Sequence, residues 1–120
     1  MDFRLTEDDR LLQQSVRDFI ENSANAQWRE IEKTKTIPDS LIAEAKELGL
    51  LGLSIPEQYG GVGFSVTQKA LVHEMLGRGP WGLSTFISVH TGIGCIGIVR
   101  FGSEEQKQNT ENRMKRLSSA

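Results

Sequence analysis

The stretch that decides the fold is residues 47–65, ELGLLGLSIPEQYGGVGFS. Its Gly49 predicts a left-handed exit from a helix, because glycine adopts a positive φ without steric cost. An apolar run follows as far as Pro56, which cannot donate a backbone hydrogen bond. A glycine-rich loop comes next, and Ser65 can cap a new helix. Apolar side chains in a loop are costly to leave in water, so we expect a connector that is buried beneath helices.

Helical patterns flank this connector on both sides. Before it, residues 6–9 (TEDD) predict a capped helix start, and a second short helix begins at Pro38. After it, a third helix begins at Ser65 and breaks at GRGP, residues 77–80. No segment shows the convincing two-residue alternation of a strand. The sequence therefore predicts an all-α fold, an up-and-down-type bundle of about five helices with a buried Gly/Pro-rich connector.

Residues 81–101 are the least polar part of the chain and carry no charge before Arg100. Small residues are scattered among large apolar ones, which predicts a helix buried on most sides. We do not expect a membrane span, because glycines and hydroxyl groups weaken transfer into lipid. Gly102 ends this helix, and a last helix follows from Ser103.

The composition indicates one ordinary domain, with 120 residues, 38% apolar and 25% charged, and a net charge of −2. That charge makes no electrostatic case for nucleic acid. The single cysteine, Cys95, excludes an intramolecular disulfide and a cysteine-rich zinc site. The acidic first residues do not resemble a secretory signal. We expect a domain over residues 1–108 and a disordered or frayed tail over residues 109–120.

Three patterns suggest chemistry but lack its context. The motif G-x-G-x-x-G occurs as GIGCIG at residues 92–97, but no strand pattern precedes it. The sequence HEMLG at residues 73–77 begins like a zinc-protease helix, but a glycine replaces the second histidine. His90 and Cys95 differ by five positions and point in different directions on a helix, and His90 either lines a cavity or bonds in the interior. The residues alone reveal no catalytic constellation and no metal site.

Four collinear patterns resemble the N-terminal helical domain of the acyl-CoA dehydrogenase family. They are the connector, FRLTEDDRLLQQSVRDFIE at residues 3–21, IP followed by LIAEAKELG at residues 41–49, and FGSEEQKQ at residues 101–108. The resemblance implies a flavoprotein with three parts, namely this domain, a middle β domain and a C-terminal helical bundle. Such an oxidoreductase oxidises the Cα–Cβ bond of an acyl-CoA thioester in fatty acid metabolism. A carboxylate removes the α-proton, FAD accepts a hydride from the β-carbon, and the electrons usually pass to an electron-transfer flavoprotein.

The family also implies what this chain lacks. The flavin is held mainly by the middle and C-terminal parts, and the catalytic carboxylate lies beyond this sequence. We therefore expect FAD in the parent enzyme, no cofactor and no catalytic residue in this chain alone, and no activity of the chain by itself. After residue 108 the chain has NTEN, where the family continues with an aromatic residue, a leucine and a proline. The family further implies a homo-oligomer, located in the bacterial cytoplasm or the mitochondrial matrix.

The resemblance places the substrate-binding positions at Thr85, Phe86, Val89 and Ile93, where the family's fourth helix walls the acyl-chain cavity. Their spacings of one, three and four put them on one helical face. Val89 implies an apolar cavity bottom, and Phe86 would shorten the cavity to favour a short or medium acyl chain. The alternative is that all four residues are ordinary core.

Besides an acyl-CoA dehydrogenase, the sequence leaves two alternatives open. The first is that the parent is a relative on the same scaffold, such as an acyl-CoA oxidase or a flavin-dependent monooxygenase. The second is that the chain is a non-catalytic helical interaction module. The sequence leaves acyl chain length, electron acceptor and oligomeric state undecided.

Overall fold

The structure, a computed structural model, describes residues 3–117, with side chains through residue 110. These residues form helices and no strand, so the predicted all-α fold is confirmed. The α-helices are α1 (Glu7–Asp18), α2 (Trp28–Thr34), α3 (Asp39–Glu47), α4 (Val66–Leu76), α5 (Trp81–Thr91), α6 (Ile96–Phe101) and α7 (Glu104–Leu117). Four short helical turns complete them: the π-helical η1 (Phe19–Ala24) and the 3₁₀ turns η2 (Asn25–Gln27), η3 (Leu50–Gly52) and η4 (Glu57–Tyr59).

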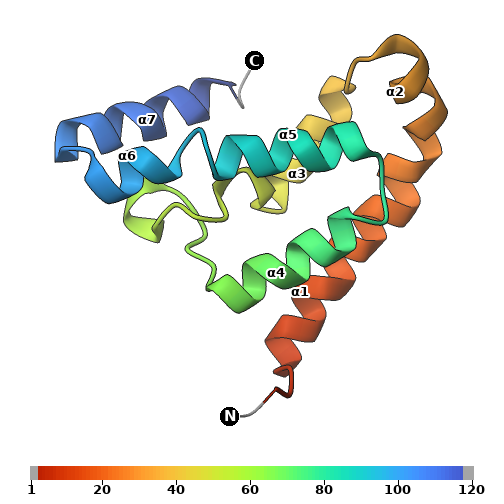
Figure 1. Cartoon of the computed structure of the whole chain (residues 1–120), viewed down its shortest axis with the longest axis horizontal. Helices are drawn as coiled ribbons and strands as arrows, with labels where there is room; N and C mark the ends of the chain where they lie inside the picture. Colours follow the sequence, from red (N-terminus) through yellow and green to blue (C-terminus); the bar gives the residue numbers. More distant parts are fainter. Residues whose placement is uncertain (1–2, 118–120) are drawn as a thin grey trace.

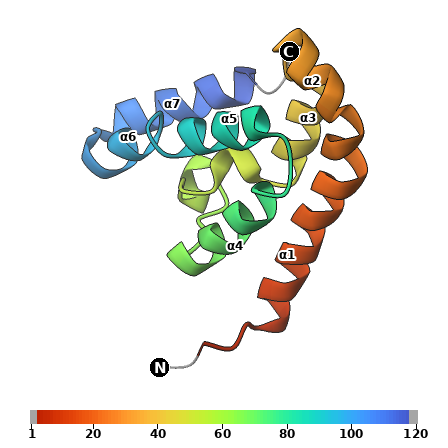
Figure 2. The ribbon, with the colours of Figure 1, turned by 45° about the vertical axis from the view of Figure 1, so that its right-hand side comes forward.

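The first helical segment runs from α1 through η1 and η2 into α2 without an extended break. Its predicted start is confirmed, because the Thr6 hydroxyl accepts from the Asp9 amide at 3.1 Å and the Asp9 carboxylate accepts from the Thr6 amide at 3.2 Å. Such a capping box satisfies two backbone donors at once. Helix α4 packs alongside α1, and the two helices lie side by side in both views (Figures 1 and 2).

The connector contributes four buried side chains, Leu50, Leu53, Ile55 and Tyr59, to the interior. Leu50 and Leu53 have no exposed surface, and Gly49 leaves α3 with a φ of 79°. The chain then doubles back on itself, since the Val62 amide donates to the Gly52 carbonyl at 3.1 Å. The connector therefore supplies core side chains while its own backbone groups bond internally.

Two groups of buried side chains hold the fold. The larger one joins α1, η1, α2, α3, η3, α4 and α5, and it consists of Val16, Phe19, Ile20, Ala24, Ile31, Leu41, Ala45, Leu50, Leu53, Val72, Met75, Leu76, Leu83 and Ile87. The smaller one contains Ile55, Tyr59 and Cys95, with the half-buried Val99 packed against it. Helices α6 and α7 contribute no member to the larger group among the described side chains.

The prediction of one helix buried on most sides over residues 81–101 is wrong in both respects. The helix breaks between Thr91 and Ile96, where Gly92 takes φ −91° and ψ −86°. Only 22% of its most apolar 18-residue stretch is buried inside the protein. Glycine lacks the side chain that favours continued helix, and α5 offers only one face to the core.

The same segment, Trp81–Phe101, is by length and composition apolar enough to cross a membrane, with a hydropathy of 1.5. Core helices pass the same test, and here the inward side chains of Leu83, Ile87 and Thr91 are buried in the protein. The outward side is the unusual feature, because its apolar residues Phe86 and Val89 are 37% and 46% exposed in the described part of the chain.

Helix α7 extends beyond the predicted domain end at residue 108. Its first turn carries a capping pair, in which the Gln106 amide donates to the Ser103 hydroxyl at 3.2 Å. The frayed tail was expected from residue 109, whereas the helix continues to Leu117, and residues 118–120 lie outside the described residues.

Candidate functional site

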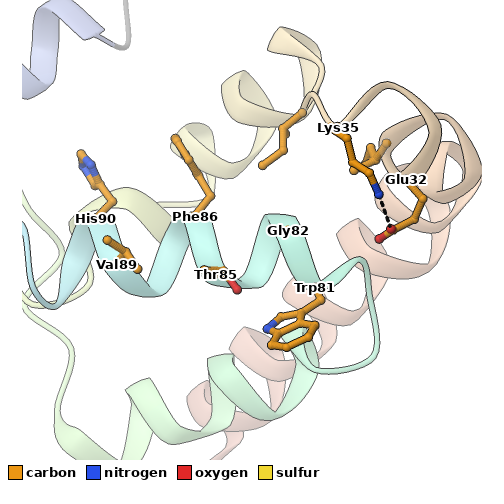
Figure 3. A pocket seen from close by; sticks show the side chains of 10 residues that line it. Glu32, Lys35, Trp81, Gly82, Thr85, Phe86, Val89 and His90 are labelled. Carbon is orange, nitrogen blue, oxygen red and sulfur yellow. Dashed lines mark ion pairs between the residues drawn. The ribbon is translucent and has the colours of Figure 1, made fainter.

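An apolar groove runs between α5 and α2 (Figure 3). Its volume is about 780 Å³, which lies within the range of small-molecule sites. It is lined by residues of α2, of the segment after α2, and of the outward face of α5, namely Ile31, Glu32, Lys35, Ile37, Trp81, Gly82, Thr85, Phe86, Val89 and His90. The groove is therefore made by two helical segments that are distant in sequence.

The groove exists because α5 has two apolar faces. Leu83 and Ile87 point into the core and have no exposed surface. Phe86 and Val89 lie on the opposite side and are 37% and 46% exposed. A helix that is apolar on both sides is expected to be covered on both sides. One cover is the domain's own core, and the groove marks where the other would lie.

The structure brings together three of the four predicted site residues. Thr85, Phe86 and Val89 all line the groove. Ile93 does not, because it lies in the turn beyond α5, where it is 84% exposed. None of the four belongs to the buried core, so the reading of them as ordinary core residues is wrong for this chain.

His90 lies on the same face, one helical turn after Phe86. Their rings stack with centroids 6.3 Å apart and planes inclined by 12°. Burial lowers the pKa of His90, so the imidazole is biased towards its neutral form. This neutral, stacked ring extends the apolar surface of Phe86 rather than adding a charge to the groove.

The far wall of the groove was not predicted. It comes from α2 and the segment after it, where Ile31 is buried in the core and Ile37 packs against it. Lys35 ends α2 with a φ of 57°, and its ammonium lies 3.7 Å from the Glu32 carboxylate (Figure 3). The spacing of these residues in the sequence does not predict a groove, because the groove depends on how α2 and α5 are placed relative to each other in the fold.

The described residues offer no metal site. No group of three histidine, cysteine, aspartate or glutamate side chains lies close enough among them to hold an ion. His73 instead faces α5, with its Nδ1 atom 3.4 Å from the Ser88 hydroxyl. Burial, and secondarily the charge of Lys69, lower the pKa of His73. His73 therefore bridges two packed helices, α4 and α5.

The GIGCIG motif does not form a dinucleotide cradle. Its first two glycine amides are already bonded within the chain, Gly92 to the Ser88 carbonyl and Gly94 to the Val89 carbonyl, both at 2.9 Å. A phosphate cradle needs such amides to point at the ligand from the start of a helix after a strand. The lysine of the α2–α5 groove is paired with Glu32 rather than directed at an anion. The GIGCIG motif therefore does not supply the amides of a dinucleotide phosphate site.

The sequence matches the family profile "Acyl-CoA dehydrogenase, N-terminal domain" over residues 6–116. The chain belongs to the acyl-CoA dehydrogenase family. An acyl-CoA dehydrogenase of Bacillus subtilis is 35% identical over 103 residues, which cover 86% of this chain and 27% of that protein. The chain thus spans about a quarter of the length of this curated relative.

Solved structures show the same fold. An acyl-CoA dehydrogenase from Bacillus anthracis, complexed with FAD, superimposes with a TM-score of 0.80 at 34% identity, over 87% of this chain and 18% of that one. A structure described as the electron transferring flavoprotein of Acidaminococcus fermentans superimposes with a TM-score of 0.86 at 30% identity, over 98% of this chain and 31% of that one. The family match reaches residue 116, which agrees with a helix α7 that continues past residue 108.

Proposed function

We propose that this chain acts as the N-terminal part of an FAD-dependent acyl-CoA dehydrogenase, where α5 forms a wall of the acyl-chain cavity. The observation that carries the proposal is the outward apolar face of α5, with Thr85, Phe86 and Val89 in one groove. An exposed apolar surface of this kind marks a binding or packing face. The position of this face matches the one that the family resemblance assigns to the substrate.

The exposed side chains extend the argument along the segment. Trp81 is 80% exposed, and Ile93 and Phe101 are 84% and 87% exposed. Burying a side chain of this size contributes about 1.5–3 kcal/mol. In the proposed enzyme, the rest of the flavoprotein and the acyl chain supply this cover. Without that cover, the same apolar surface would drive self-association of the chain. We also propose that the parent enzyme is a homo-oligomer.

The chemistry of the proposed enzyme divides between this chain and the rest. FAD, held elsewhere, supplies the hydride acceptor, and a carboxylate outside this chain supplies the base. The residues of α5 exclude water from the acyl chain and align it by apolar contact. Electron-transfer flavoprotein is the proposed acceptor, and the bacterial cytoplasm or mitochondrial matrix the proposed location. By itself the chain would bind no flavin and show no activity.

Phe86 sets the proposed substrate length. Its ring lies in the groove and stacks on His90 with centroids 6.3 Å apart. A large ring in an apolar cavity shortens it, so short or medium acyl chains are the proposed substrates. Val89, next along the face, keeps the cavity bottom apolar.

The test begins with the native protein purified from its source. We expect a polypeptide several times longer than 120 residues, with the visible absorbance of a flavin that bleaches when a saturated acyl-CoA is added without oxygen. In that enzyme, Phe86→Ala should shift kcat/KM towards longer acyl-CoA substrates by about tenfold, since one or two methylenes in an apolar pocket are worth about that much. Phe3→Ala, which removes a phenyl ring that is 85% exposed, is the matched control and should leave the preference unchanged.

Two outcomes would overturn the proposal. A native species of this length without flavin would mean that family membership does not bring the activity. A flavoenzyme whose chain-length preference is the same with Phe86→Ala as with Phe3→Ala would remove α5 from the cavity wall.

A further inference from the structure

Helices α6 and α7 are attached to the domain differently from the other helices. They pack on each other, and α7 reaches the rest of the chain chiefly through η4 of the connector. Both views show the pair together at one end of the molecule, away from α1 (Figures 1 and 2). The described side chains of this pair take no part in the larger core, so the pair can change position without disturbing that core.

A turn with two glycines links the pair to α5. It comprises residues 92–95, and its backbone at Gly92 leaves the helical region. Within the turn the Gly94 amide donates to the Val89 carbonyl at 2.9 Å, and the Ile96 amide then donates to the Gly92 carbonyl at 3.0 Å. A β-carbon added at Gly94 would lie 2.9 Å from the His90 carbonyl oxygen, so only glycine fits this position without a shift of the backbone. Hinges are typically short segments of this kind at the end of an element.

One cluster of polar contacts closes the pair against the connector. The Tyr59 hydroxyl donates to the Glu104 carboxylate at 2.5 Å, across 45 positions of sequence. The Lys107 ammonium lies 3.8 Å from the other oxygen of that carboxylate and 5.7 Å from the centre of the Tyr59 ring. The hydrogen bond to Glu104 raises the pKa of Tyr59, so the phenol keeps its proton and remains the donor.

We propose that α6 and α7 form an arm that opens as one unit about residues 92–95, and that the Tyr59–Glu104 hydrogen bond is the latch that holds it closed. The small core of Ile55, Tyr59 and Cys95, with Val99, is the surface that separates when the arm opens. The Glu104 side chain is 77% exposed, so water weakens this hydrogen bond, and it can hold the arm closed only because the interface is small. The arm and its latch do not depend on the proposed enzymatic activity.

Cys95 provides a built-in probe of the opening. It is the chain's single cysteine, and it is only 3% exposed because it lies in the small core at the base of the arm. Burial also raises the pKa of its thiol, which slows its reaction in the closed form. The rate at which the native chain reacts with a thiol reagent such as 5,5′-dithiobis(2-nitrobenzoate) therefore reports how often the arm is open.

The decisive variants are Tyr59→Phe and Glu104→Ala. Tyr59→Phe removes only the hydroxyl and leaves the ring in the small core, and we expect it to increase the Cys95 labelling rate by about two- to tenfold. Glu104→Ala removes the acceptor and should give a similar increase. Glu105→Ala is the matched control, because Glu105 is an exposed acid in the same first turn of α7 and should leave the rate unchanged.

Amide hydrogen exchange of the same variants separates arm opening from general loss of stability. We expect faster exchange in α6, α7 and residues 92–95, and unchanged exchange in α1 and α4. Labelling of Tyr59→Phe at the native rate would overturn the latch. Exchange that speeds up equally in α1 and α4 would overturn the arm as a separate unit. If Glu104→Ala and Glu105→Ala both increased the Cys95 labelling rate to the same extent, the charge at the start of α7, and not the hydrogen bond, would govern the contact.

Discussion

Gly61→Ala should be among the most destabilising single substitutions in this chain. Gly61 lies in the connector, where its backbone passes directly over that of Ile55. A β-carbon added there would lie 2.5 Å from the Ile55 β-carbon and closer still to the Ile55 carbonyl oxygen. Real β-carbons do not approach other atoms so closely, and a backbone neighbour cannot move aside as a flexible side chain can.

The structure sets the size of the effect. Relieving the clash means separating two backbone segments that are joined by the Gly61–Pro56 hydrogen bond of 3.2 Å and the Gly63–Ile55 hydrogen bond of 2.9 Å. Losing these bonds costs about 1 kcal/mol each, and the strain of overpacking a core adds about 1–3 kcal/mol. We therefore expect Gly61→Ala to lower the free energy of unfolding by about 3–5 kcal/mol. That is a large share of the roughly 5–15 kcal/mol that stabilise a typical domain.

The assay is urea unfolding of the chain, followed by far-ultraviolet circular dichroism. With a urea slope of about 1–3 kcal/mol per molar, the midpoint should fall by about 1–5 M. Gly82→Ala is the matched control, because no atom lies within 4 Å of the added methyl group and the residue is helical. It should be neutral or stabilise by up to about 1 kcal/mol. Equal midpoints for the two variants would refute the close backbone contact and the argument built on it.

Three further predictions concern the caps, the titration and the groove. Thr6→Ala removes the acceptor of the first capping box and should cost about 1 kcal/mol in urea unfolding, whereas Thr6→Ser, which keeps the hydroxyl, should cost little; equal losses would contradict the cap. Burial lowers the pKa of His90 below its ordinary value of 6.5, so the folded chain binds fewer protons than the unfolded chain and its stability should fall as the pH drops below about 6.5. His90→Gln should flatten that fall in a pH series of unfolding midpoints, and an unchanged slope would show that the ring is not desolvated. Phe86→Ala in the isolated chain should weaken binding of an apolar dye to the groove, and unchanged binding would place the dye, and the apolar surface it reports, elsewhere.

Helix caps and turns could be predicted from the sequence, because they depend on residues only a few positions apart. The capping residues Thr6, Ser65 and Ser103 all bond as the pattern predicts, because a cap needs only a side chain and an amide three residues on. The left-handed turn at Gly49 follows from the same kind of local rule. Burial of the connector was predictable because a run of large apolar side chains has few other places to go.

The segment over residues 81–101 was misjudged because composition does not say which side of a helix meets the core. Leu83 and Ile87 face inward, whereas the equally apolar Val89 and Ile93 face outward. A domain that packs against further protein has two apolar faces on one helix, and both look like core in the sequence. The groove itself depends on α2 meeting α5, which no local pattern encodes.

The connector also links fold to function. Leu50 and Leu53 of the connector lie in the same core group as Leu83 and Ile87 of α5, and η3 packs directly against that helix. The inward face of α5 therefore packs on the connector, and this packing determines the direction in which the outward face of α5 points. A shift of the connector would turn Phe86 relative to the opposite wall of the groove before it unfolded the domain, because Phe86 is carried by the helix that packs directly on η3. Substitutions in the connector that leave the chain folded should consequently alter ligand preference at α5, although none of the connector's residues lines the groove.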